Sequence, residues 1–316
     1  MLNAICKNPE LRGLVVQQGG SKALCSMALE GNEKGMRQAS QALARIGITQ
    51  DPSIAFPGQR VSTQQLLFHQ CDFNCDHFGC CSYFLCTDIS YEYLYTLNTY
   101  INPWVHPNKA SLIVLFSLQA VDIVRPICQL LNVEYDGHEN FEALMCLGNL
   151  ASLNDSTRNR ILKESDFVTQ IESYMFEDHM MIRRAAVQCF TNLCVSPLHV
   201  KRCEGKNDKI KFCVLLCGDD SDIEVVRAAA GALAMLTSQS DVCCRKVFDS
   251  IQWNECLLNL LSNPDLDIVL RGVVVVKNMI TAGKDIAEKL IETHIMECLQ
   301  AHIFKAKCKY EMTHLI

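Results

Sequence analysis

Cysteine and histidine are the residues of this 316-residue chain whose types and spacing could hold a metal ion. Five of its 19 cysteines and two of its nine histidines lie between residues 69 and 86. They are His69, Cys71, Cys75, His77, Cys80, Cys81 and Cys86. Thiolates and imidazoles are the usual zinc ligands, but the run fits no spacing template of a zinc site. We expect no metal site, and a zinc-binding module is the alternative that the cluster leaves open.

The other cysteines predict thiols and not disulfides. An odd number of cysteines cannot close completely into intramolecular bridges, and the pairs show no repeating spacing. Residues Met1–Pro9 lack the charged start and apolar core of a secretory signal. We therefore expect a cytoplasmic protein in which most cysteines are small, buried, apolar side chains.

Catalytic motifs fail on spacing. Residues Gly19–Lys22 read Gly-Gly-Ser-Lys, but the phosphate-loop pattern GxxxxGK followed by Ser or Thr is absent. The patterns HExxH, GxSxG and the calcium loop of EF-hands are absent as well. The sequence therefore predicts a protein that is not an enzyme and carries no cofactor.

Charge and hydropathy exclude two classes of partner. The chain has 29 basic and 35 acidic residues and a formal charge of -6, so no broad positive field attracts nucleic acid. Its longest apolar runs, such as Leu112–Phe116 and Val273–Val276, are far shorter than the roughly 18 residues of a membrane span. We expect neither nucleic acid nor membrane as a partner.

A repeat of about 43 residues organises the chain. Four similar segments carry Asn149, Asn192, Met235 and Asn278 at the same place, each 43 residues after the last. Apolar residues recur at helical spacing, and Gly19-Gly20 separates two short predicted helices. Helical units of this length bury their apolar faces by stacking. The sequence predicts an all-α, right-handed armadillo-repeat solenoid interrupted by a non-repeat insert.

The insert covers residues 61–119. Arg45 occupies the equivalent place in an earlier repeat, but Asn149 follows it by 104 residues instead of about 43. Removing the 59 residues Val61–Gln119 shortens this step to 45. The insert holds 11 of the 23 aromatic residues but only one basic residue, Lys109. Armadillo repeats are thus expected in residues 1–60 and 120–316, both truncated at their outer ends.

The ends of the insert resemble splice signals. Val61-Ser62 can be encoded by GTAAGT and Gln119 by CAG, and Ser111–Leu118 is what a pyrimidine-rich tract translates into. We interpret the insert as a poorly ordered, translated intron, and a genuine binding loop is the alternative. Sequencing a transcript across codons 60 and 120 decides between them.

With the insert removed, the chain resembles the UCS-domain myosin chaperones of animals, the type named uncoordinated forty-five, nearer their striated-muscle form. The resemblance begins where residues 54–60 meet Ala120–Pro126. It continues through Asn140–Met145, Tyr174–Ala186, Gly205–Lys211 and Ala229–Thr237. Several consecutive matches make it specific to the carboxy-terminal domain of that family.

The resemblance implies a non-enzymatic co-chaperone that binds the myosin head domain and assists its folding and assembly. The family acts together with Hsp90, which it engages through a tetratricopeptide domain that has no counterpart in these residues. The alternative is a generic armadillo adaptor that binds extended peptides of partner proteins. A chaperone suppresses aggregation of its client, whereas an adaptor only binds short peptides.

The candidate client-binding groove lies on the third helix of each repeat. The ladder asparagines fall where armadillo proteins often hydrogen-bond the backbone of an extended peptide, because an amide both donates and accepts. Residues one turn earlier lie on the same face, and arginines stand near the amino ends of these helices. The predicted groove residues are Phe141, Met145, Asn149, Arg184, Gln188, Asn192, Arg227 and Asn278. Three alternatives stay open: the asparagines bridge neighbouring helices, the arginines are solvated helix ends, and Phe141 is an ordinary core residue, as we expect for Tyr174.

Overall fold

The computed structural model describes residues 1–49, 118–132, 134–218 and 222–313. Every regular element in these ranges is a helix, and none of these helices is long and apolar enough to cross a membrane. The predicted insert lies outside the described residues except for its last two, which begin helix α7. The cysteine and histidine cluster and the proposed splice signals, apart from Leu118 and Gln119, therefore lie outside the described part of the chain.

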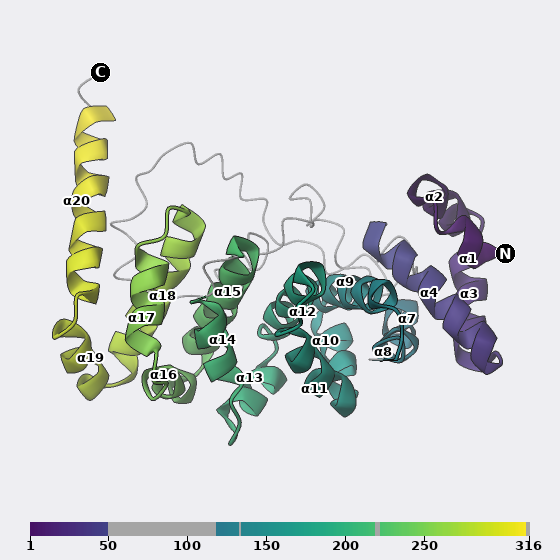
Figure 1. Cartoon of the computed structure of the whole chain (residues 1–316), viewed down its shortest axis with the longest axis horizontal. Coiled ribbons are helices and arrows are strands. Elements are labelled where there is room, and N and C mark those ends of the chain that lie inside the picture. Colours follow the sequence, from purple (N-terminus) through teal and green to yellow (C-terminus); the bar gives the residue numbers. More distant parts are fainter. Residues whose placement is uncertain (50–117, 133, 219–221, 314–316) are drawn as a thin grey trace, which may run out of the picture. The chain divides into compact units, whose positions relative to one another are not determined.

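The described helices fall into two compact units, and the boundary follows Arg202 inside α13 (Pro197–Glu204). The helices of unit 1 are α1 (Leu2–Ile5), α2 (Pro9–Gln17), α3 (Gly20–Glu30), α4 (Glu33–Thr49), α7 (Leu118–Asp122), α8 (Val124–Cys128), α9 (Gly137–Leu153), α10 (Asp155–Lys163), α11 (Ser165–Tyr174) and α12 (Met180–Leu193). Those of unit 2 are α14 (Lys209–Leu216), α15 (Ile223–Gln239), α16 (Asp241–Phe248), α17 (Trp253–Leu261), α18 (Leu266–Ala282), α19 (Lys284–Ile291) and α20 (Ile295–Thr313). Figure 1 labels them.

The helix boundaries confirm the predicted repeat. The long helices α9, α12, α15 and α18 begin at Gly137, Met180, Ile223 and Leu266, each 43 residues after the last. Two shorter helices precede each of α12, α15 and α18, and the three helices together form one armadillo repeat. Aspartate side chains cap three of the long helices by accepting from backbone N–H groups of the first turn. Each unit is therefore a stack of armadillo repeats.

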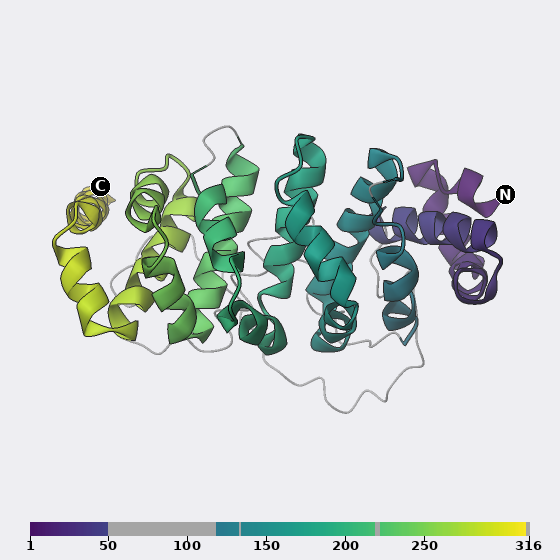
Figure 2. The same ribbon diagram turned by 60° about the horizontal axis from the view of Figure 1, so that its bottom comes forward.

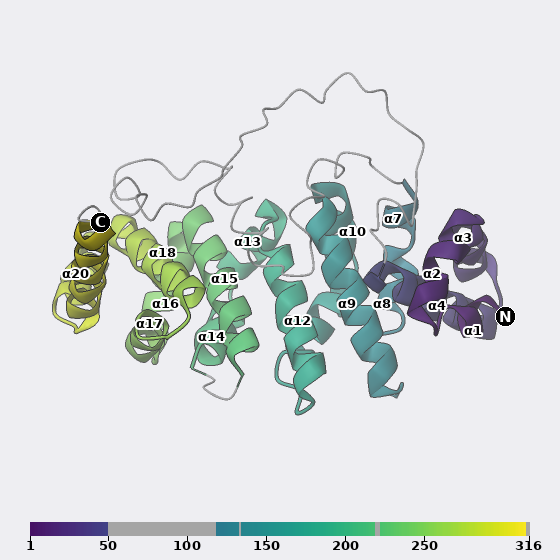
Figure 3. The same ribbon diagram turned by 90° about the horizontal axis from the view of Figure 1, so that it is seen from above.

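The long helices of neighbouring repeats pack in parallel. In unit 1 the amino end of α9 meets that of α12, since the Cδ1 atom of Ile182 lies 3.4 Å from where a Cβ on Gly137 would stand. Near their carboxyl ends, the Cα of Cys189 lies 3.8 Å from where a Cβ on Gly148 would stand. Views turned by 60° and 90° show the two helices side by side, and α15 and α18 likewise in unit 2 (Figures 2 and 3). Their facing leucines, alanines and valines form the core of each unit.

A glycine pair separates α2 from α3, as predicted for the armadillo form. Gly19 has φ 74°, a left-handed backbone that only glycine adopts without strain. Gly20 starts α3, and a Cβ there would lie 2.6 Å from Cγ1 of Val15. The tight turn explains why two glycines stand together here, and it accounts for the Gly-Gly-Ser-Lys run without a phosphate.

We expect Gly19→Ala to lower the free energy of unfolding by about 1 kcal/mol, because alanine pays the left-handed backbone penalty. The matched control is Gly137→Ala. Gly137 opens α9 with an ordinary φ, and a Cβ there makes only a 3.4 Å contact with Ile182. Urea unfolding of both variants measures the difference, and equal stabilities would contradict the strain argument.

The described cysteines behave as the sequence predicts. The 13 cysteines whose side chains the structure describes are free thiols, and 12 of them are buried while Cys298 is half-buried. Burial raises the pKa of Cys25, Cys146 and Cys244 to about 12. A thiol that stays protonated is a poor nucleophile, so these cysteines serve as packing residues.

Alkylation of the folded protein should therefore be selective. At pH 8 we expect Cys146 and Cys244 to react about a thousandfold more slowly than an ordinary thiol, since their thiolate fraction is that much smaller and burial blocks access. Cys298 is the internal control and should react readily. Timed iodoacetamide labelling followed by peptide mass mapping checks this, and similar rates at all three positions would show that the repeats open freely.

Candidate functional site

The exposed face of α9 and α12 in unit 1 carries most of the predicted groove residues. Phe141, Met145 and Asn149 are each half-buried and stand four residues apart on α9. Arg184 and Gln188 occupy the equivalent face of α12 and are also half-buried. Because α9 and α12 pack in parallel, these five side chains form one surface, which we call the α9–α12 face.

The predicted peptide-binding asparagines join neighbouring helices. Asn149 Nδ2 donates to the carbonyl of Gly47 at 2.9 Å, which ties α9 to α4. Asn192 Nδ2 donates to the carbonyl of Gly148 at 2.9 Å and ties α12 to α9. In unit 2, Asn278 Nδ2 donates to Thr237 Oγ1 at 3.2 Å and ties α18 to α15. In all three residues the amide N–H group therefore bridges neighbouring helices, which is the alternative to peptide binding.

Burial disfavours two of these asparagines as groove residues. Asn192 is fully buried, and its Oδ1 accepts from Gln188 Nε2 at 3.1 Å. Asn278 is buried as well. Burial between helices disfavours the predicted peptide contacts of Asn192 and Asn278. Asn149 is half-buried and stays on the α9–α12 face.

The predicted arginines have different environments. Arg227 donates to Glu224 Oε2 and to Asp265 Oδ2, both at 2.5 Å, so it joins the amino ends of α15 and α18. These bonds hold the pKa of Arg227 above its usual range. Arg227 is half-buried, so its contact with a partner stays a prediction, and the two bonds hold it between α15 and α18. Arg184 remains half-buried on the α9–α12 face.

A polar network beside this face joins α4 to α9. Arg45 Nε donates to Glu142 Oε1 at 2.8 Å, and both side chains are buried. Gln41 and Arg37 donate to Glu139 at 2.6 and 2.8 Å. The sequence analysis missed this network. Its partners are about a hundred residues apart, and no spacing rule connects them across the insert.

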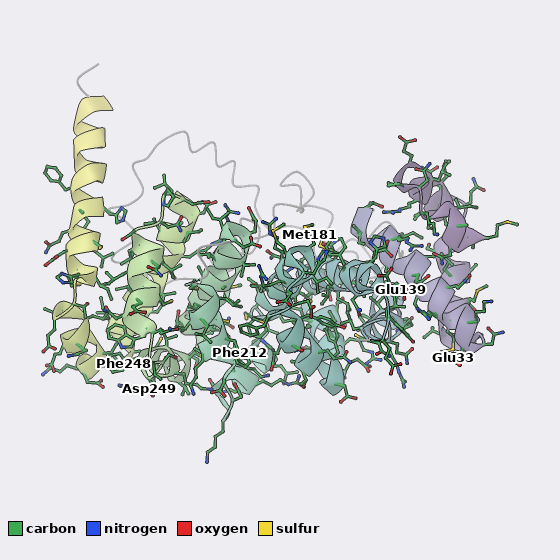
Figure 4. The ribbon with its side chains drawn as sticks, in the orientation of Figure 1. Glu33, Glu139, Met181, Phe212, Phe248 and Asp249 are labelled. Carbon is green, nitrogen blue, oxygen red and sulfur yellow. The ribbon has the colours of Figure 1, made fainter. Side chains whose placement is uncertain are left out.

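Two exposed methionines were also missed. Met180 and Met181 open α12 with about 45% and 42% of their surface exposed. Figure 4 labels Met181 and, on α9, Glu139. Met181 precedes Arg184 by one turn on the same side of the helix, so helical spacing alone could have placed it beside the groove. Tyr174, by contrast, is buried and donates to Asn140 Oδ1 at 3.0 Å, which confirms it as a core residue.

The chemistry of the α9–α12 face is that of a binding surface. It offers an aromatic ring, a thioether, two amides and a guanidinium, which contact a polypeptide through apolar area and hydrogen bonds. Within the described ranges, no group of three histidines, cysteines or carboxylates is placed to hold a metal ion.

Comparison with known proteins identifies relatives of the chain. No protein-family model matches it. It is 38% identical over 299 residues to protein unc-45 homolog B of Xenopus laevis, which covers 94% of this chain. UNC-45 from Drosophila melanogaster superposes with a TM-score of 0.73 at 42% identity, over 95% of this chain and 30% of that one.

A third comparison extends the likeness to a more distant protein. The myosin chaperone UNC-45 of C. elegans, solved in complex with an Hsp90 peptide, has a TM-score of 0.70 over 94% of this chain and 27% of that one. At 24% identity this likeness shows the fold alone. The chain spans about a quarter of the length of its curated relatives, 26% for the Xenopus laevis protein. Over nearly all of its residues, the chain is therefore homologous to the UNC-45 proteins.

Proposed function

We propose that the chain binds the myosin head domain and assists its folding and assembly, as a non-enzymatic part of a co-chaperone that acts together with Hsp90. The observation that carries the proposal is the 38% identity to an unc-45 homologue over 299 residues. The C. elegans relative is described as a myosin chaperone. The proposal assigns client binding, and not Hsp90 binding, to these repeats.

The α9–α12 face is the proposed client-binding surface. Phe141 and Met145 supply half-buried apolar area, and Met181 adds an exposed thioether at the amino end of α12. Unbranched methionines adapt to varied apolar surfaces, which suits a client that is partly folded. Arg184 and Asn149 add polar groups beside them.

Aggregation of a gently heated myosin head domain tests the function. We expect the full chain, at near-equal molar amounts, to reduce light scattering from the heated client. The control is an unrelated heat-labile protein, whose scattering should stay unchanged. Unchanged scattering of the head domain, in the presence of a chain that circular dichroism shows to be folded, would contradict the proposal.

Charge placed on the proposed surface should weaken client binding. We expect Met145→Glu and Met181→Glu together to reduce the affinity for the myosin head by about tenfold or more, since each carboxylate must lose water against an apolar client. Met27→Glu on α3 is the control, because Met27 is exposed to a degree similar to Met181 but lies on another helix of unit 1. Surface plasmon resonance measures both, and an equal loss in the control would remove the α9–α12 face from the site.

A generic peptide adaptor is the second candidate. The half-buried amides of Asn149 and Gln188 favour it, because such amides can hydrogen-bond an extended backbone. An adaptor would bind short unfolded myosin peptides as tightly as the whole head domain and would leave its aggregation unchanged. Titration with both ligands distinguishes the two functions.

A further inference from the structure

The amino ends of α15 and α18 expose three aliphatic side chains. Ile223 begins α15 and Leu266 begins α18, with 43% and 63% of their surface exposed. Leu270, one turn after Leu266, is 46% exposed. The two helices pack together, and packed helices lie about 8–10 Å apart. The three side chains therefore form one area, which we call the unit 2 patch.

The backbone beneath the unit 2 patch is held rigidly. Asp222 caps α15 by accepting from the N–H of Glu224 at 3.2 Å, and Asp265 caps α18 by accepting from the N–H of Asp267 at 2.8 Å. Arg227 links the two helix ends through Glu224 and Asp265. A surface that is already ordered loses little conformational entropy when a partner binds.

A second arginine, Arg271 of α18, is bonded to the same end of α15. Arg271 Nη1 donates to the backbone carbonyl of Arg227 at 2.5 Å, and its side chain is almost fully buried. Burial lowers the pKa of Arg271 to about 10, so it remains charged at neutral pH. Both arginines are therefore engaged below the aliphatic side chains and do not offer positive charge to a partner.

The charge around the unit 2 patch is negative. The capping and first-turn residues of α15 and α18 contribute four carboxylates, and Arg227 and Arg271 offset two of them. The carboxylates are Asp222, Glu224, Asp265 and Asp267. Asp222 is buried, and Glu224 and Asp265 pair with Arg227. Asp267 is exposed beside Leu266. An apolar area with a negative rim attracts positive charge and repels anions.

We propose that the unit 2 patch binds a basic amphipathic helix of a partner protein, with leucine-like side chains on one face and lysine or arginine on the other. The apolar side chains cover Ile223, Leu266 and Leu270, and the basic ones reach Asp267. Negative charge disfavours nucleic acid and anionic membranes as occupants. The proposal does not depend on the proposed myosin function, because the patch belongs to unit 2 and the α9–α12 face to unit 1.

A fluorescent helical peptide built from leucine on one face and lysine on the other is the probe, and fluorescence anisotropy with the full chain is the measurement. We expect binding that weakens with salt, and at least a tenfold loss of affinity in the variant that combines Leu266→Ser with Leu270→Ser. Asp267→Lys should weaken binding severalfold and flatten its salt dependence. All three positions are exposed, so circular dichroism should show an unchanged fold.

Two matched controls make the test specific. Ile251→Ser removes a fully exposed aliphatic side chain, and Glu255→Lys reverses an exposed charge on α17, both in unit 2 but outside the patch. These variants should bind the peptide as the unchanged chain does. Equal losses in the controls, equally tight binding of a leucine and glutamate peptide, or retention of the chain on anionic vesicles would overturn the proposal. A failed myosin assay would leave this result unaffected.

Discussion

Arg45→Met is expected to lower the free energy of unfolding by about 3–5 kcal/mol, the usual effect of removing one partner of a buried ion pair. Arg45 and Glu142 are both less than 10% exposed, and they join α4 to α9. Without Arg45, Glu142 keeps only His138, whose Nε2 is 3.3 Å from Oε1. Glu142 Oε2 is buried and has no hydrogen-bond partner among the described residues. The variant would leave a carboxylate poorly solvated between two repeats.

Arg45 also supports the first helix of unit 1. Its Nη1 donates to Asn3 Oδ1 at 2.6 Å, and its backbone carbonyl accepts from Arg12 Nη1 at 3.1 Å. The methionine retains most of the volume of the arginine stem, so the loss should reflect charge and hydrogen bonds and not a cavity. Chemical unfolding followed by circular dichroism gives the free energy.

A double variant separates the ion pair from its surroundings. We expect Arg45→Met with Glu142→Leu to recover most of the stability lost in the single variant, because an apolar pair needs no solvation. Arg37→Met is the control, since Arg37 pairs with Glu139 near the same helices but is exposed. Its effect should be much smaller. A double variant no more stable than Arg45→Met would mean that packing, and not charge, holds this junction.

Asn192→Ala is expected to lower the free energy of unfolding by about 2 kcal/mol. The buried amide donates to Gly148 on α9 and accepts from Gln188 one turn earlier, so alanine breaks both bonds and leaves a small cavity. Asn149→Ala is the matched control, since Asn149 makes the equivalent interhelical bond but is half-buried and solvent can replace it. Urea unfolding should show the smaller loss in Asn149→Ala.

The same pair of variants tests where a client is contacted. At a temperature where both are folded, Asn192→Ala should bind the myosin head domain as the unchanged chain does, because its side chain is not accessible. A loss of binding with an intact fold in Asn192→Ala would restore this asparagine to the client-binding surface. Stability and binding therefore need to be measured on the same preparations.

Much of the architecture follows from local pattern. The 43-residue ladder correctly places α9, α12, α15 and α18, because each repeat must present the same apolar stripe to its neighbours. Gly19-Gly20 correctly marks the break between α2 and α3, since a left-handed backbone demands glycine. The buried thiols were predictable from composition and the absence of disulfide spacing.

The candidate site was only partly predictable. Helical spacing correctly places Phe141, Met145 and Gln188 on an accessible face. It cannot tell whether an amide at the next turn meets solvent or a neighbouring helix, because that depends on how closely the helices approach. Asn192 and Asn149 occupy equivalent ladder positions, yet one is fully buried and the other half-buried.

The sequence by itself determined the repeat, its helical class and the resemblance to myosin chaperones, because these rest on periodicity and on runs of neighbouring residues. Only the tertiary structure decided the partners of Arg45, Arg227 and Asn192, which lie on other helices. The physical reason is that a side chain's partner is set by the packing of two surfaces. In these three cases, the two residues that contact each other are 38 to 97 positions apart along the chain.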